Sequence, residues 1–179
     1  YSGSSQGWVT ATAGNDATAS QMASASGGTE TTSGDYKIHT FNSDATFTVS
    51  SANPATTFSY MVIAGGGAGS AGLGSNAGGG GGAGGFREGK CSSDPYADSP
   101  LDAGAGLTLT AGSYPITVGG GGAAQPSGGG RGASGSNSVF STITSAGGGA
   151  GGAGASTPGP RDGANGGSGG GKAGSDVPG

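Results

Sequence analysis

Residues 60–67 read Tyr-Met-Val-Ile-Ala-Gly-Gly-Gly, so an apolar, β-branched run passes into glycine with no turn residue between them. The same transition recurs at residues 114–119 (Tyr-Pro-Ile-Thr-Val-Gly) and at residues 140–147 (Phe-Ser-Thr-Ile-Thr-Ser-Ala-Gly). Runs of this composition are typical of β-strands. Strands that continue directly into glycine at several places indicate a repeated architecture rather than a linker.

The glycine runs are the second feature of the sequence. We predict that they form extended rods, left-handed with three residues per turn as in polyproline II. Rods without side chains pack side by side and hydrogen-bond to one another, and larger residues would hold them apart, as on the collagen axis. The competing interpretation is a flexible, disordered Gly/Ser chain, and the strand signals between the runs count against it. The runs occupy residues 65–72, 78–85, 119–122, 128–135, 147–154 and 163–174.

The composition argues against nucleic-acid binding and against a membrane-spanning protein. Glycine supplies 47 of 179 residues, while charged residues make up 9% and the net charge is −4. Nucleic-acid binding normally requires a basic stripe, and no apolar run reaches the ~18 residues of a membrane-spanning helix. The bias toward Ser, Thr, Gly and Ala favours an extracellular protein. Since the chain begins with Tyr1 and shows no signal-peptide pattern, we expect either a removed leader or a piece of a longer chain.

The strand pattern predicts an all-β fold, in which a small antiparallel β-structure runs into a bundle of polyglycine II rods behind an extended N-terminal arm. Strands are expected at residues 35–41, 46–50 and 57–63, with the last pairing back as a central strand covered on both faces. A hairpin is expected over residues 107–118 and one last strand over residues 139–144. No 3.6-residue period indicates a helix. The predicted core consists of Ile38, Phe41, Phe47, Val49, Phe58, Tyr60, Val62, Ile63, Leu107, Leu109, Ile116, Val118, Phe140 and Ile143.

Two parts of the chain are expected, an arm over residues 1–33 and a glycine-rich domain over residues 34–179. Residues 7–13 alternate and contain the sole Trp, which predicts a short strand. Residues 14–34 are small and polar, as in a linker. The arm strand has two interpretations, an exposed aromatic segment or a strand that adds to the sheet of an adjacent copy. The assembly residues on the second interpretation are Trp8, Val9, Thr10 and Ala11.

The combination of motifs resembles the glycine-rich domain of phage tail-fibre proteins and large bacterial surface proteins. The resemblance covers about residues 34–175 and rests on residues 34–41, 46–49, 61–67, 111–119 and 138–149. It implies a small β-structure that feeds a sandwich of polyglycine II rods. In the phage adhesins, the loops that join the rods lie at the tip and contact host receptors. The resemblance therefore implies tip loops here at residues 86–103, 123–127 and 156–162.

Few residues are candidates for chemistry. His39 lies in a predicted strand without a nucleophile pattern, so we expect a solvated or core-edge residue. Cys91 is expected to be a free thiol or, alternatively, an intermolecular disulfide or attachment point. Asp94, Asp98 and Asp102 do not match an EF-hand loop and are expected to be solvated, with Ca²⁺ as the lesser alternative.

We predict no enzyme activity, no cofactor and no metal site. The glycine runs lack the following helix and the Lys-Ser/Thr pair of a phosphate-binding loop. Two hypotheses remain, a homopolymeric extracellular filament linked by the arm, and an adhesin whose tip loops bind a cell-surface receptor or glycan. Neither predicts nucleic-acid binding or membrane insertion. The candidate residues of the long tip loop are Phe86, Arg87, Cys91, Asp94, Tyr96 and Asp98.

Overall fold

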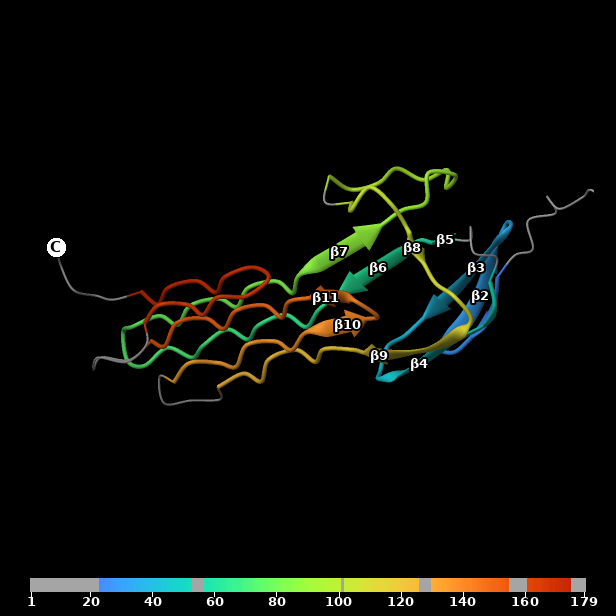
Figure 1. The fold of residues 1–179 in the computed structure, drawn as a ribbon. Coiled ribbons are helices and arrows are strands. Elements are labelled where there is room, and N and C mark those ends of the chain that lie inside the picture. The colour runs from blue at the N-terminus through green and yellow to red at the C-terminus, as the bar shows by residue number, and fades with distance from the viewer. Residues whose placement is uncertain (1–22, 53–56, 101, 126–129, 155–160, 175–179) are drawn as a thin grey trace, which may run out of the picture.

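The computed structural model describes residues 23–52, 57–100, 102–125, 130–154 and 161–174. Short antiparallel sheets lie at one end of the molecule, and a bundle of extended glycine-rich segments lies at the other (Figure 1). No helix occurs in the described ranges, which confirms the all-β prediction. The strands are β1 (Ser24–Ser26), β2 (Thr29–Ser33), β3 (Tyr36–Thr40), β4 (Ala45–Ser51), β5 (Thr57–Phe58), β6 (Tyr60–Ile63), β7 (Phe86–Gly89), β8 (Leu107–Thr108), β9 (Gly112–Thr117), β10 (Ser138–Phe140) and β11 (Ile143–Ser145).

The largest sheet has five strands in the order β1-β4-β9-β10-β11, and its neighbouring strands are antiparallel. Three two-stranded sheets accompany it, β2-β3, β5-β8 and β6-β7. The prediction of a linker over residues 14–34 is wrong where β1 and β2 form, because β1 pairs with β4 and β2 pairs with β3. The predicted arm strand at residues 7–13 lies outside the described residues.

Several predicted pairings are wrong. The strand expected at residues 57–63 is divided into β5 and β6, which pair with β8 and β7 rather than with β4. The predicted central position fails because Met61 is 63% exposed and Ile63 is 55% exposed. β8 and β9 do not form a hairpin with each other. The expected last strand is a hairpin, β10-β11, whose turn includes Ser141 at a positive φ of 53°.

The core of the sheet region is centred on the Phe47 ring in β4. Four rings meet it edge-on, with centroid distances of 5.1 Å to His39, 6.1 Å to Phe41, and 5.9 Å each to Phe58 and Phe140. Aromatic pairs favour this edge-to-face geometry. The predicted core is therefore right at its centre. It is wrong at Ile38, which is 46% exposed, and at Ile63.

Glycine-rich segments continue β6, β9 and β11 and run side by side away from the sheets (Figure 1). Their contacts repeat every third residue. Between the first two segments, the amides of Ala64, Gly67 and Ser70 donate to three carbonyls at 2.8–3.0 Å. This period is that of a helix with three residues per turn. We name the segments rod 1 (64–72), rod 2 (77–85), rod 3 (119–125), rod 4 (130–137), rod 5 (146–154), rod 6 (161–164) and rod 7 (166–174).

Rod 5 lies at the centre of the bundle. Backbone hydrogen bonds join it to rods 1, 2, 4, 6 and 7. Residues 147–154 are all buried, and the only side chains in this stretch belong to Ala150 and Ala153, at 1% and 2% exposure. The bundle therefore has a core made almost entirely of peptide backbone, in which hydrogen bonds take the place of packed apolar side chains.

Candidate functional site

Close approach of the rods explains the choice of glycine. A Cβ built on Gly149 would lie 1.9 Å from the Ala164 carbonyl oxygen, and one on Gly151 would lie 2.0 Å from that of Gly79. Ordinary van der Waals contact begins near 3.4 Å, so no larger residue fits without separating the rods. At Gly80 and Gly120, by contrast, an added Cβ meets nothing within 4 Å. The steric prediction is confirmed for the interior of the bundle and does not apply to its outer surface.

The long loop after β7, residues 90–103, is held in place by polar contacts with the sheet region. The Ser59 hydroxyl accepts a hydrogen bond from the Cys91 amide at 2.8 Å and donates to the Asp94 carboxylate. The Cys91 thiol is buried and lies 3.0 Å from the Thr57 hydroxyl. Cys91 is therefore a free thiol that the fold covers.

Two further carboxylates fix the loop internally. Glu88, 8% exposed, accepts a hydrogen bond from the Ser99 amide at 3.1 Å. The Asp102 carboxylate accepts hydrogen bonds from the amides of Lys90 and Gly104, both at 2.9 Å. The loop thus has a defined shape, although it contains no strand beyond residue 89. The prediction of a loop over residues 86–103 is wrong for Phe86–Gly89, which form β7.

Tyr96 is the aromatic residue that the loop presents to solvent, at 45% exposure. Burial of part of its side chain raises the pKa of its hydroxyl, and the nearby Glu88, Asp94 and Asp102 carboxylates raise it further, against a hydrogen bond with Ser59 that lowers it. The Lys90 ammonium lies 5.4 Å from the centre of the Tyr96 ring, a cation–π arrangement.

The position of this loop differs from the expectation. It emerges from β7 beside the sheets, whereas rods 1 and 2 are joined at the opposite end of the bundle (Figure 1). The candidate residues Cys91, Asp94, Tyr96 and Asp98 therefore do not lie with the rod-joining turns. At that far end, Leu73 and Asn76 exchange backbone hydrogen bonds at 3.0 and 3.2 Å. Residues 123–125 and 161–162 also lie there, while 126–127 and 156–160 fall outside the described ranges.

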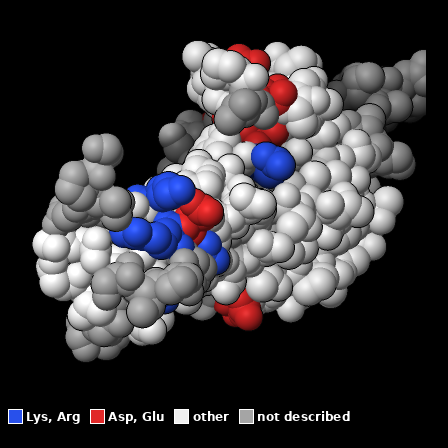
Figure 2. Space-filling model, turned by 90° about the vertical axis from the view of Figure 1, so that its left-hand side faces the viewer, with Lys and Arg blue, Asp and Glu red and all other residues white. Residues whose placement is uncertain are grey.

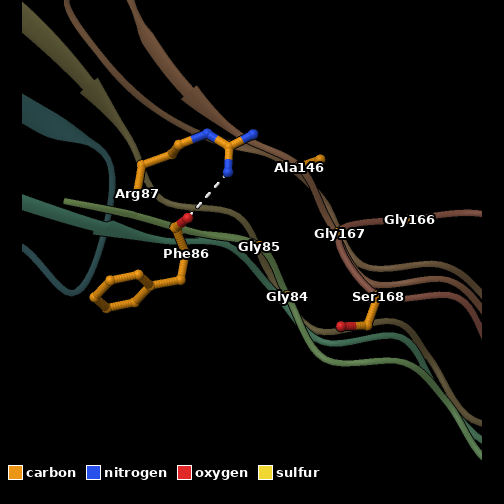
Figure 3. Close-up of a pocket in the computed structure, with 8 residues that line it drawn as sticks. All are labelled: Gly84, Gly85, Phe86, Arg87, Ala146, Gly166, Gly167 and Ser168. Atoms are coloured by element: carbon orange, nitrogen blue, oxygen red, sulfur yellow. Dashed lines mark hydrogen bonds between the residues drawn. The ribbon is translucent and has the colours of Figure 1, made fainter. Parts of the chain in front are cut away.

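A shallow pocket of about 330 Å³ lies where the sheets meet the rods (Figure 3). Its wall is mostly backbone, and the Arg87 side chain extends over it toward Ala146 while donating to the Phe86 carbonyl at 3.1 Å. The lining residues are Gly84, Gly85, Phe86, Arg87, Ala146, Gly166, Gly167 and Ser168. This lining contains no pair of side chains that could act as nucleophile and base.

His39 lies at the edge of the core. Its Nδ1 is 2.8 Å from the Gly27 carbonyl oxygen, and its Nε2 is 3.8 Å from the Glu30 carboxylate. Glu30 in turn accepts a hydrogen bond from the Lys37 ammonium at 2.7 Å, and that hydrogen bond holds the pKa of its carboxyl below the usual value. The expectation of a core-edge residue is confirmed.

Sequence reasoning missed a basic cluster at the far end of the bundle. Arg131 on rod 4, Arg161 on rod 6 and Lys172 on rod 7 gather around Asp162 (Figure 2). Arg131 donates to the Asp162 carbonyl, and Lys172 pairs with the Asp162 carboxylate at 3.0 Å. These cations lie 11 or more residues apart in the sequence. The three cations meet because successive rods run in opposite directions, and the sequence alone does not show this.

Metal-ligating side chains and membrane-spanning helices bear on other functions. Within the ranges that the structure describes, no group of three or more His, Cys, Asp or Glu side chains could hold a metal ion. None of the described residues forms a helix long and apolar enough to cross a membrane. The candidate arm residues Trp8, Val9, Thr10 and Ala11 lie outside the described residues.

Comparison with known proteins identifies the family. No significant match was found among curated proteins or among solved structures. A family model described as a glycine-rich domain matches residues 39–179, which include the rods and most of the strands. The chain therefore belongs to the glycine-rich domain family.

Proposed function

We propose that this chain is a non-enzymatic structural protein, the repeating subunit of an extracellular filament linked by its N-terminal arm. One observation carries the proposal. The described chain enters at the sheet end and leaves at the far end of the rods, where the Gly174 amide donates to the Ala77 carbonyl at 3.0 Å (Figure 1). A stiff body with the two ends of the described chain on opposite sides suits end-to-end assembly.

The sheet end has edges to which an arm strand could add. β2 and β3 pair only with each other among the described strands, so each has one edge without a strand partner. The outer face of this ribbon presents Tyr36 and Ile38, which are 43% and 46% exposed. An added strand satisfies the free backbone groups of such an edge, and neighbouring apolar side chains supply the contact area.

The arm is long enough for this connection. Residues 1–22, fully stretched at about 3.3 Å per residue, reach up to about 70 Å. Rod 5, residues 146–154, is about 28 Å long at about 3.1 Å per residue. An arm that leaves the sheet end of one copy therefore passes the rods of the preceding copy and reaches its sheets. Because such a contact joins two different surfaces, it does not close on itself and generates an open filament.

Negative-stain electron microscopy of the full chain tests the proposal. Wild-type protein should form long fibres without any partner. A Thr10→Pro substitution should abolish them, because proline removes a backbone donor from the arm strand. Ser5→Pro, placed before the predicted strand, is the matched control and should leave the fibres intact. Monodisperse wild-type particles would contradict the filament.

The loop at residues 90–103 supports a second candidate, an adhesin that binds a cell-surface receptor or glycan. Its hydrogen bonds hold a fixed shape, and it presents Tyr96 to solvent. Exposed aromatic residues on fixed loops are typical of recognition surfaces. If the loop is a receptor site, wild-type protein binds a glycan array or intact cells and the Tyr96→Ala variant does not. Equal binding by the two proteins would argue against this function.

A further inference from the structure

The charges of this acidic protein are unevenly distributed along its length. Three of its six Lys and Arg residues, Arg131, Arg161 and Lys172, lie at the far end of the rods: Arg131 and Lys172 contact Asp162, and Arg161 contacts the Gly174 carbonyl. Figure 2 shows this group of basic side chains around an acidic one. We call these four residues the basic tip. At the opposite end, beside the sheets, β7 and the loop that follows it hold four carboxylates against two cations. We call this second group the acidic loop, and it consists of Arg87, Glu88, Lys90, Asp94, Asp98 and Asp102.

The two arginines of the basic tip have no carboxylate partner among the described residues. The Arg161 guanidinium donates to the Asn76 side-chain oxygen at 3.3 Å and to the Gly174 carbonyl at 3.0 Å, and both of these acceptors are neutral. Arg131 donates to a carbonyl, and the Nε groups of both arginines are buried without a hydrogen-bond partner. The sole carboxylate of the tip, on Asp162, is paired with Lys172. Within the described part of the chain, the two guanidinium groups therefore form no ion pair.

The carboxylates of the acidic loop likewise contact neutral groups instead of cations. The carboxylates of Glu88, Asp94 and Asp102 accept hydrogen bonds from neutral amides or a hydroxyl. Lys90 lies over the Tyr96 ring instead of beside a carboxylate. Asp98 is exposed. Viewed along the rods, negative groups project beyond the outline of the bundle, while the basic tip faces the viewer (Figure 2).

We propose that the basic tip of one copy docks on the acidic loop of a second copy, with the two molecules parallel and displaced along the rod direction. The two surfaces lie at opposite ends of the molecule, so the acidic loop of one copy cannot reach the basic tip of the same copy (Figure 1). The contact is heterologous and open-ended. This inference rests on the proposed filament. Within it, the contact between opposite charges would fix how far successive subunits are displaced along the rod direction.

The strength of exposed ion pairs indicates what this contact contributes to the filament. Exposed ion pairs contribute about 0.2–1 kcal/mol each and are screened over about 10 Å at 0.1 M salt. A few such pairs select the correct surface and orientation of the incoming subunit, whereas the arm supplies the stronger attachment. Filament formation is therefore expected to be weakened, and not abolished, by salt.

Charge reversal on exposed positions tests the contact in the full chain. The tip variant is Lys172→Glu with Gln125→Glu, and the loop variant is Asp98→Lys with Ala97→Lys; all four positions are exposed. Each variant changes the sign of its own surface, so each alone should raise the critical concentration for fibre formation roughly tenfold at low salt. The combined variant, in which both signs are reversed, should return it toward the wild-type value, and 0.5 M NaCl should remove the differences. A combined variant that is no better than either parent would overturn the proposal.

A mixing experiment separates this contact from the filament itself. Each variant carries Trp8→Asp, which blocks the arm strand, and association is followed by sedimentation equilibrium at low salt. The tip and loop variants should each remain monomeric alone and associate when mixed, because the mixture restores one wild-type contact. No association on mixing would reject the docking surface even if fibres form. Fibres that are absent in wild-type protein while the mixture associates would reject the filament alone. Capture of heparin by the wild-type tip with no effect of the loop variant would show that the tip binds an anionic polymer instead.

Discussion

Gly149 and Ala164 lie so close that a Cβ on Gly149 would be 1.9 Å from the Ala164 carbonyl oxygen. The same glycine receives a hydrogen bond from the Gly82 amide at 2.8 Å and is buried in the central rod. Steric fit and hydrogen bonding therefore depend on one another at this position. The bundle packs this closely because most of its interior residues are glycine and the remaining side chains in the central rod are single methyl groups.

Gly149→Ala should destabilise the bundle, because the added methyl group forces rods 5 and 6 apart and weakens several hydrogen bonds together. Overpacking in tight interiors costs about 1–3 kcal/mol. The change is measured by thermal unfolding. Gly120→Ala is the matched control, because an added Cβ there meets nothing within 4 Å. Equal melting temperatures for the two variants would mean that the rods are not packed in this way.

Phe47→Ala should destabilise the sheet region by about 3–5 kcal/mol, as is usual for truncation of a buried aromatic residue. Phe47 is 5% exposed and contacts four other rings. Urea unfolding measures the difference. Met61→Ala, at a residue 63% exposed, serves as the control and should stay within about 0.5 kcal/mol of wild type.

Ser59→Ala should loosen the loop at residues 90–103. The Ser59 hydroxyl joins the Cys91 amide to the Asp94 carboxylate, so its removal frees the segment that covers the thiol. The rate of Cys91 modification by a thiol reagent should rise several-fold, because reactivity depends on access. Ser92→Ala changes an exposed neighbour and should leave the rate unchanged. A slow reaction in the Ser59→Ala variant would show that other contacts hold the loop.

Because of Glu30, the stability of the β2-β3 ribbon should depend on pH in the acidic range. The hydrogen bond from Lys37 lowers the pKa of the Glu30 carboxyl in the folded state. A carboxyl group whose pKa is lower in the folded than in the unfolded state stabilises the folded protein at pH values above its unfolded pKa of about 4.3. This stabilisation is lost as the pH falls through the pKa of the folded state.

The Glu30→Gln variant should therefore melt slightly below wild type at pH 7, and the difference should shrink below about pH 4. Melting curves across this range provide the measurement. A difference that stays constant with pH would assign the effect to packing instead of charge.

The arrangement of the chain was predictable in part. Residues 60–67, where an apolar run passes into glycine, indicated strand β6 followed by rod 1, and the structure has both. Phe47 was also among the residues predicted for the core, and the structure buries it at 5% exposure. These features are local, because alternation decides which face of a strand is apolar and the absence of a Cβ decides how closely a rod can pack.

Strand partners could not be predicted in the same way. β5 pairs with β8 and β6 pairs with β7, although the sequence suggested a hairpin between β8 and β9. Every strand edge offers the same backbone donors and acceptors, so the choice between partners depends on how all the strands pack together. The exposure of Ile63 follows from this choice, since β6 belongs to a two-stranded sheet with an open face.

The sequence by itself determined that the chain is all-β and rich in rods, because these properties depend on residue type and local period. Only the tertiary structure decided that Arg131, Arg161 and Lys172 meet at one end while the acidic loop lies beside the sheets. Each rod reverses the direction of the one before it, and residues distant in sequence therefore come together at the same end. Charge is encoded residue by residue, but its position in space depends on where the rods turn.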